Sequence, residues 1–199
     1  WGETIFEVID HFVKTEQEEL TFAQFMGENM KYHSSTGSMR MVQRAAAKFG
    51  AHYFTIPGPL YILNDLVRRG FMAEPSIRRT LDVAKQADLI ISGIGTLESV
   101  DSIPLWNENR AAIFPEVAAN QVAGMVFGRP YDVNGAFLNP TQDKCLSLPL
   151  ETILKVPRRF AVVQGKSKYR ATLGALRGKF FTDLVINEAT AVRILNELK

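Results

Sequence analysis

An apolar run that stops at two glycines constrains the fold of this chain more than any other feature. Residues 89–96 read LIISGIGT. The run is rich in β-branched residues and too short for a typical helix, which predicts a buried parallel strand. Gly93 and Gly95 then allow the backbone of the following turn to approach a ligand closely. Such turns lie at the carboxyl edge of open α/β sheets, where ligands bind, although a purely structural turn fits the same residues.

Apolar residues in the rest of the chain alternate between helical and strand-like spacing. The helical spacing predicts helices over residues 4–14, 38–49, 60–70, 75–84, 112–123, 169–177 and 188–198. Short apolar segments predict strands over residues 20–26, 52–56, 146–148, 160–163 and 184–186. Residues 125–138 are expected to be strand-like and irregular, with a bend and a hairpin turn over 128–135. This alternation predicts an α/β fold with a parallel sheet joined by right-handed connections.

Size and charge limit the class of protein. The 199 residues suffice for one sizeable core and are few for two domains. Basic and acidic side chains number 23 and 21, so this segment lacks the charge that nucleic acid or an anionic membrane would attract. The single Cys145 excludes an internal disulfide and suits the reducing cytoplasm. No apolar run approaches the roughly 20 residues that cross a bilayer.

Three further segments have residues suited to a polar or anionic ligand. Gly2 and Thr4 begin the first helix, where free amides and the helix dipole favour an anion, and plain helix capping is the alternative. Lys168 stands just before the helix over 169–177 and is either a phosphate ligand or an ordinary surface lysine. The loop over 28–37 is either part of a sugar pocket or a solvated turn; its polar residues are His33, Ser34, Ser35 and Thr36.

Several common catalytic motifs are absent from the sequence. It has no His/Cys cluster with metal-ligand spacing, no G-x-S-x-G elbow and no Walker loop. Gly93 and Gly95 match only the first spacing of the dinucleotide fingerprint, because Glu98 occupies the third glycine position. We therefore expect no metal, no cofactor and no catalytic residues.

Taken together, three segments resemble the effector-binding domain of SorC-type bacterial transcriptional regulators. They are DLIISGIGT at 88–96, RPYDVNG at 129–135, and the stretch from GKSK at 165–168 through ALRG at 175–178 to EATA at 188–191. The resemblance implies a Rossmann-like parallel sheet sandwiched by helices, similar to ribose-5-phosphate isomerase and glucosamine-6-phosphate deaminase. It also implies a phosphorylated sugar as effector, DNA binding through a helix-turn-helix domain upstream of this segment, and a homodimer or homotetramer.

The same resemblance implies which residues bind the effector. WGET at 1–4 matches the family's Trp-Gly-x-Thr phosphate loop, so residues 1–199 are expected to form one effector-binding domain that begins inside this loop. Lys168 matches the family's lysine, and Gly93, Gly95 and Thr96 are expected to form the floor of the pocket. The implied effector-binding residues are Gly2, Glu3, Thr4, Gly27, Gly93, Gly95, Thr96 and Lys168. Thr4, Gly95 and Lys168 should then meet at one rim of the sheet.

Two positions depart from the family pattern. Many relatives have a second glycine where Glu28 follows Gly27, and relatives tend to have an acidic residue where this chain has Met125. A carboxylate at the second position accepts sugar hydroxyls, so its loss predicts weaker selection for hydroxyl-rich sugars.

Three functions remain open at this point. The leading hypothesis is a ligand-sensing domain that changes the geometry of an oligomer when a phosphorylated sugar binds. The alternative is a sugar-phosphate isomerase or amino-sugar-phosphate deaminase, which needs a general base at the reacting carbons. Glu98 and Asp101 are the candidate carboxylates after the glycine turn, whereas Asp132 lies in the hairpin region. No carboxylate–histidine pair is evident. A structural assembly domain is the third.

Overall fold

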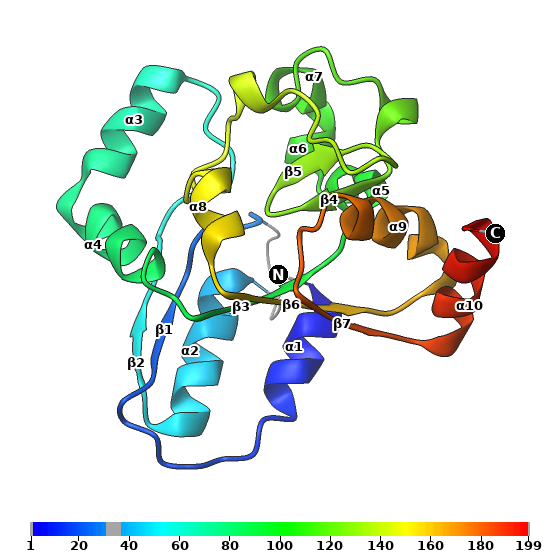
Figure 1. Cartoon of the computed structure of the whole chain (residues 1–199). Helices are drawn as coiled ribbons and strands as arrows, with labels where there is room; N and C mark the ends of the chain where they lie inside the picture. The colour runs from blue at the N-terminus through cyan, green and yellow to red at the C-terminus, as the bar shows by residue number, and fades with distance from the viewer. Residues whose placement is uncertain (1, 31–36, 199) are drawn as a thin grey trace. The chain divides into compact units, whose positions relative to one another are not determined.

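The computed structural model describes residues 2–30 and 37–198 (Figure 1). His33, Ser34, Ser35 and Thr36 of the expected polar loop lie outside the described residues. The chain divides into a first unit, Trp1–Asp88 with Lys144–Val156, and a second unit, Leu89–Asp143 with Pro157–Lys199. Within the described residues, no helix combines the length and the apolar character needed to span a bilayer.

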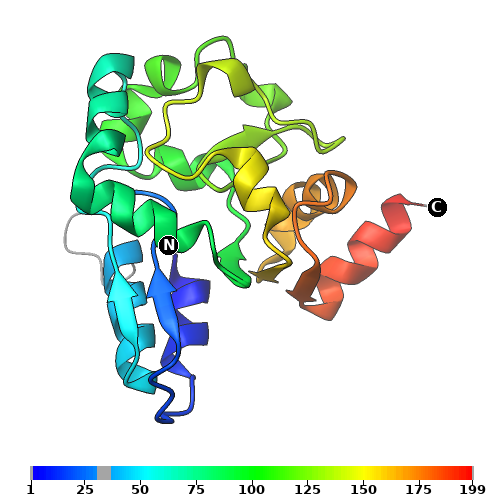
Figure 2. The same ribbon diagram turned by 60° about the vertical axis from the view of Figure 1, so that its left-hand side comes forward.

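In the first unit, two parallel strands are covered on one face by two helices. Strand β1 (Thr21–Ala23) pairs with β2 (His52–Phe54), and helices α1 (Glu3–Asp10) and α2 (Ser38–Phe49) pack behind them (Figure 2). Helix α2 has the predicted bounds, because Gly50 adopts the left-handed conformation that ends it. Both helices begin at the end toward which the strands point, so helix starts and carboxyl ends of strands meet there.

Helix α3 does not begin where the apolar spacing predicted. It spans Asp65–Ala73, whereas the prediction was a helix over 60–70, closed by Gly70. The side-chain Oδ1 of Asn64 accepts hydrogen bonds from the backbone N–H groups of Leu66 at 2.9 Å and Val67 at 3.1 Å, which fixes the start. Gly70 therefore lies inside the helix. Helix α4 (Pro75–Ala84) begins at Pro75 as predicted.

Residues 146–148 do not form the predicted edge strand. The backbone of Leu146 lies between two segments, accepting from Gly27 N at 2.8 Å and donating to Leu60 O at 2.7 Å. The side chains of Leu146 and Leu148 are fully buried, and helix α8 (Leu150–Lys155) follows. This segment is a core element of the first unit, joined to its neighbours by single bridges instead of a ladder.

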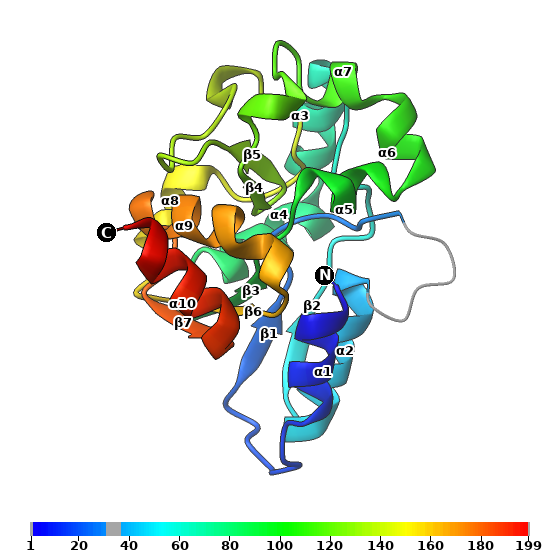
Figure 3. The same ribbon diagram turned by 90° about the vertical axis from the view of Figure 1, so that its right-hand side faces the viewer.

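The second unit is built on a three-stranded parallel sheet. Strand β6 (Arg158–Val163) lies between β3 (Leu89–Gly93) and β7 (Asp183–Ile186), and helices α9 (Tyr169–Arg177) and α10 (Glu188–Glu197) lie side by side next to it (Figure 3). The predicted parallel α/β architecture is confirmed. The prediction that β3 is buried holds only for Ile90, because β3 is at the end of this sheet and leaves Leu89 44% exposed.

The region between β3 and the hairpin is broken into short helices. These are α5 (Leu97–Asp101), α6 (Pro104–Glu108) and α7 (Arg110–Ile113), followed by a 3-10 turn, Ala119–Gln121. The predicted helix over 112–123 is therefore wrong. Pro115 has no amide for a helical hydrogen bond and disfavours a helical residue before it, and Glu116 adopts a positive φ of 63°.

A hairpin of two antiparallel strands follows, β4 (Gly124–Val126) and β5 (Arg129–Tyr131). Its tight turn is at Phe127 and Gly128, which have φ angles of 53° and 77° as in the mirror-image turns that suit hairpins. The bend and the hairpin turn predicted over 128–135 thus correspond to two features, of which the first is this tight turn. The second is a turn in which the carboxylate of Asp132 accepts from the N–H groups of Asn134 and Ala136 at 2.9 and 2.8 Å.

Tyr131 joins this hairpin to α9. Its side chain is 0% exposed, and its hydroxyl donates to Ala171 O at 2.7 Å. Burial raises the pKa of the Tyr131 hydroxyl well above its ordinary value, so it stays a donor. An added Cβ at Gly174 would lie 2.6 Å from Asp132 O and 3.0 Å from the Tyr131 ring. The hairpin therefore fixes the position of α9, whose first residue directly follows Lys168.

Two glycines inside helices provide a test of this packing. Gly174→Ala should destabilise the protein by about 1–3 kcal/mol, because the backbone oxygen of Asp132 leaves no room for a methyl group. Gly70→Ala in α3 should stabilise it by about 0.5–1 kcal/mol, because nothing lies within 4 Å of the added Cβ and alanine is the better helix former. Urea denaturation of both variants measures the difference, and equal effects would contradict the close approach.

Candidate functional site

The loops that follow β3 and β6 leave the same edge of the second unit's sheet. The two strands run parallel with Gly93 opposite Val162, so their carboxyl ends coincide. Gly95 and Thr96 follow the first strand, and the 3-10 turn Lys166–Lys168 follows the second. One edge of this sheet therefore carries four of the predicted residues: Gly93, Gly95, Thr96 and Lys168.

Lys168 is the cation at this edge with the most distinctive environment. It is half-buried at the start of α9, and burial lowers the pKa of its ammonium group. No ion pair joins it to a carboxylate of residues 2–30 or 37–198. Lys166, two residues earlier, is exposed. An anionic ligand would compensate the desolvated charge of Lys168, which distinguishes it from a surface lysine.

The backbone amides of the glycine turn after β3 are already used within the protein. Gly95 donates to Met125 O at 2.9 Å and accepts from Met125 N at 2.9 Å, and the Thr96 N–H faces Ser99 Oγ at 3.4 Å. Contacts from this turn to a ligand would come from the Thr96 hydroxyl, which is half-buried and lies 3.4 Å from Ser99 Oγ. Gly95 packs against Met125, since an added Cβ would lie 3.6 Å from the Cβ and the backbone oxygen of that residue. Met125 is itself buried in β4, with 6% of its surface exposed.

In the first unit, the start of α1 has the features of an anion site. Gly2 precedes the helix with a φ of 122°, a conformation that side chains disfavour, and the structure gives this helix start no side-chain cap. Glu3 is exposed and Thr4 is half-buried in the first turn. No side chain of the described residues caps this helix start, and plain helix capping at Gly2 stays the alternative to an anion site.

Gly27 has a packing role. A Cβ at this position would lie 2.6 Å from Pro59 O and 2.8 Å from Gly58 O, so only glycine fits. Its amide donates to Leu146 O at 2.8 Å. Its part in binding an effector stays a prediction, as does the meeting of Thr4 with Gly95 and Lys168, because Thr4 belongs to the first unit and the other two to the second.

The cluster that Gln24, Glu28 and Ser38 form near the carboxyl end of β1 was not predicted, although Glu28 was noted as a departure from the family pattern. Gln24, which is 2% exposed, donates through Nε2 to Glu28 Oε1 at 2.9 Å and to Ser38 Oγ at 2.8 Å. Ser38 is the first residue of α2. The sequence did contain one indication, since Gln24 interrupts an otherwise apolar segment over 20–26.

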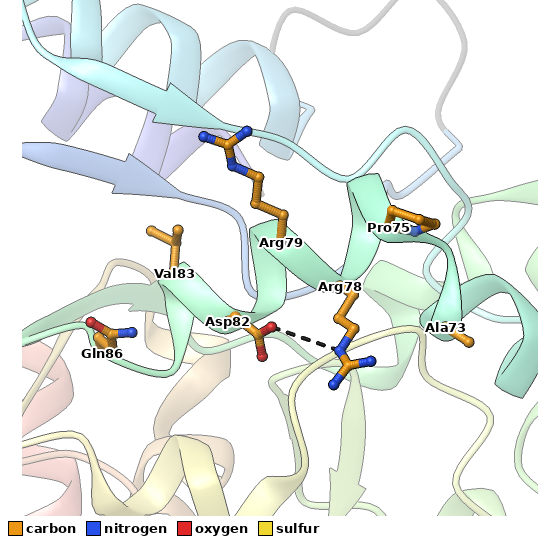
Figure 4. Close-up of a pocket in the computed structure, with 7 residues that line it drawn as sticks. All are labelled: Ala73, Pro75, Arg78, Arg79, Asp82, Val83 and Gln86. Carbon is orange, nitrogen blue, oxygen red and sulfur yellow. Dashed lines mark ion pairs between the residues drawn. The ribbon is translucent and has the colours of Figure 1, made fainter.

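A hollow on the first unit is separate from these residues. Figure 4 shows its lining side chains on and beside α4, including Arg78, Arg79 and Asp82. Arg78 pairs with Asp82 at 3.9 Å, and both side chains are at least half exposed. None of the predicted effector residues lines this hollow. In the described part of the chain, no group of three or more His, Cys, Asp or Glu side chains is placed to hold a metal ion.

Comparison with known proteins identifies relatives along nearly the whole chain. A family model described as "Putative sugar-binding domain" matches residues 1–196. The deoxyribonucleoside regulator of Bacillus subtilis is 22% identical over 201 residues, covering 100% of this chain and 63% of the relative. The sorbitol operon regulator of Klebsiella pneumoniae is 26% identical over 166 residues, covering 83% of this chain and 51% of the relative. The chain thus spans about half to two thirds of these relatives.

Solved structures share the fold. The full-length sorbitol operon regulator SorC of Klebsiella pneumoniae aligns with a TM-score of 0.87 at 24% identity, over 98% of this chain and 64% of that one. A sor operon regulator from Shigella flexneri aligns with a TM-score of 0.82, also at 24% identity, over 98% of this chain and 77% of that one. The family model covers all but the last three residues, and the chain therefore belongs to the family of sugar-binding domains that it describes.

Proposed function

We propose that this chain is the ligand-sensing domain of a sugar-responsive bacterial transcriptional regulator, and that its effector is a phosphorylated sugar. The observation that supports a phosphate is Lys168, which is half-buried at the carboxyl edge of the second unit's sheet and forms no ion pair with a carboxylate of the described residues. A desolvated ammonium group gains most from a ligand with concentrated negative charge. Family membership and the regulators among the relatives support a sugar effector.

Within this proposal, the predicted residues divide by unit. Lys168 contacts the phosphate or a sugar oxygen, Thr96 offers its hydroxyl, and Gly93 and Gly95 form the floor of the pocket. The start of α1, with Gly2, Glu3 and Thr4, is the candidate anion site of the first unit. Variants in each unit decide which of the two positions holds the phosphate.

The regulatory readout is also proposed. Ligand binding would favour one of two arrangements of a homodimer or homotetramer in the cytoplasm, and so change the spacing of DNA-binding domains outside this segment. This segment has a net charge of +2, which agrees with DNA contacts being made elsewhere.

The enzyme alternative is less favoured. The candidate base Asp101 forms an ion pair with Arg110 at 2.9 Å, and Asp132 accepts two backbone hydrogen bonds within its own turn. Both carboxylates thus have structural partners, and the named relatives are regulators.

A paired ligand panel tests the effector class. We expect a sugar phosphate at 100 times its Kd to stabilise the protein by about 2.7 kcal/mol, or about 5–10 °C in Tm, and its unphosphorylated parent to do less. Thermal melting with ribose, deoxyribose, glucose and sorbitol, each with and without its terminal phosphate, measures this. Stabilisation by no sugar or sugar phosphate would overturn the proposal.

Replacing Lys168 separates sensing from folding. Lys168→Met should weaken binding of the sugar phosphate about 10–100-fold, because one charge-assisted contact is lost. The same change should raise the Tm of the ligand-free protein, since a partly desolvated charge is removed. Lys166→Met, on the exposed neighbour, should do neither. Calorimetric titration and melting of both variants provide the measurements.

The pH dependence of this stability difference has a defined sign. Because burial lowers the pKa of Lys168 below 10.5, the folded protein sheds that proton before the unfolded chain does. The stability advantage of Lys168→Met is therefore largest below the lowered pKa and shrinks as pH rises toward 10.5. Melting curves from pH 7 upward test it, and a gap that widens with pH would contradict the burial of the charge.

Turnover assays address the enzyme alternative directly. Ribose 5-phosphate and glucosamine 6-phosphate incubated with the protein should remain unchanged, because Asp101 and Asp132 are held in structural contacts. Nuclear magnetic resonance of the sugars over several hours gives the readout, with Asp101→Asn as the variant that would abolish any conversion by this residue.

A further inference from the structure

The carboxylate of Glu28 sits at the start of α2. Its Oε1 atom accepts hydrogen bonds from Gln24 Nε2 at 2.9 Å, from Ser38 Oγ at 3.0 Å and from the backbone N–H of Met39. Met39 is the second residue of the helix, so its amide is one that no helical carbonyl can satisfy. The positive end of the α2 dipole adds to the attraction for negative charge.

The groups around this oxygen are held in place independently of Glu28. Gln24 is 2% exposed, and its Oε1 accepts from the backbone N–H of Ile56 at 2.7 Å. This bond fixes the amide so that its Nε2 points toward the carboxylate and the Ser38 hydroxyl. A buried side-chain donor from the loop after β1 and a hydroxyl and a backbone amide from the start of α2 therefore converge on one oxygen position.

We propose that Glu28 is a selectivity residue, which fills a built anion position at the start of α2 with the chain's own carboxylate. A phosphate or carboxylate of a ligand is thereby excluded from this position, because it would compete for the same donors and be repelled by a like charge. The first unit then directs an anionic group to the start of α1, and the α2 position takes at most uncharged groups. The inference rests on the proposed function only for the identity of the ligand.

Removing the Glu28 side chain from the start of α2 tests the proposal without any sugar. Glu28→Gly should become responsive to formate and inorganic phosphate, because small anions can occupy the freed donors. Thermal melting at constant ionic strength, with sodium chloride as the reference salt, gives the anion concentration at which stabilisation is half-maximal. We expect this concentration to be at least tenfold lower for the variant than for the unsubstituted protein. Ser38→Ala combined with Glu28→Gly should reduce this response, since one donor is removed.

Two matched variants control for charge and for space. Glu28→Gln keeps the position filled with an uncharged side chain and should stay unresponsive to added anions. Glu18→Gly makes the same chemical change at an exposed turn residue and should behave like the unsubstituted protein. If Glu28→Gly responds to anions no more than Glu18→Gly, the proposal is overturned.

A folding defect would not remove the test. If Glu28→Gly unfolds in chloride, its refolding yield in formate or phosphate is measured against the yield in chloride, and equal yields overturn the proposal. Sugar affinity is then compared as a ratio: Glu28→Gly should raise affinity for a sugar phosphate relative to its parent sugar. If anions rescue the variant but no sugar binds either protein, the proposed function fails while this inference stands.

Discussion

The parallel pairing of β3 with β6 is the constraint on which the arrangement of the second unit depends. Two strands that run in the same direction must end at the same edge, so the turn after Gly93 and the turn before α9 are brought together although about 70 residues separate them in sequence. The hairpin then fixes α9 through the buried hydroxyl of Tyr131 and the close approach at Gly174. Lys168 owes its position to these backbone relationships, and its half-buried state follows from them.

The charged groups at the starts of α2 in the first unit and α9 in the second unit differ in how far the protein itself satisfies them. At the start of α2, a carboxylate of the chain itself satisfies the helix amides and neighbouring donors. At the start of α9, a lysine is desolvated without a carboxylate from the described residues to balance it. At the start of α2 the protein itself supplies both the donors and the anion, whereas at the start of α9 an anionic ligand can balance the charge of the lysine. This asymmetry follows from which residues the fold brings together, since neither helix start is unusual in sequence.

The backbone of this chain is shared with solved relatives at a sequence identity of 24%. Short apolar strands, helix stops at glycine and one close helix-to-hairpin contact preserve the fold, and the solved relatives align with TM-scores of 0.82 and 0.87. Glu28 and Met125, which depart from the family pattern, both lie within this fold: Glu28 contacts the start of α2, and Met125 is buried in β4 with 6% of its surface exposed.

Local patterns determined much of the structure from the sequence. The bounds of α2 and α9, the parallel strand ending at Gly93, and Pro75 at the start of α4 all follow from residues close together in the chain. The same reasoning failed for the helix over 112–123 and the strand over 146–148, where Pro115 and contacts with distant segments prevailed.

Only the tertiary structure decided how the polar groups are used. Three of these uses follow from contacts between distant segments. The amide of Gly95 donates to Met125, the backbone of Pro59 leaves room only for glycine at position 27, and the carboxylate of Glu28 accepts hydrogen bonds at the start of α2. A hydrogen bond depends on the positions of both partners, and a local sequence pattern does not say which distant residue will lie next to a given group. The sequence therefore determined which elements form, and the folded chain determined which of their donors and charges remain for a ligand.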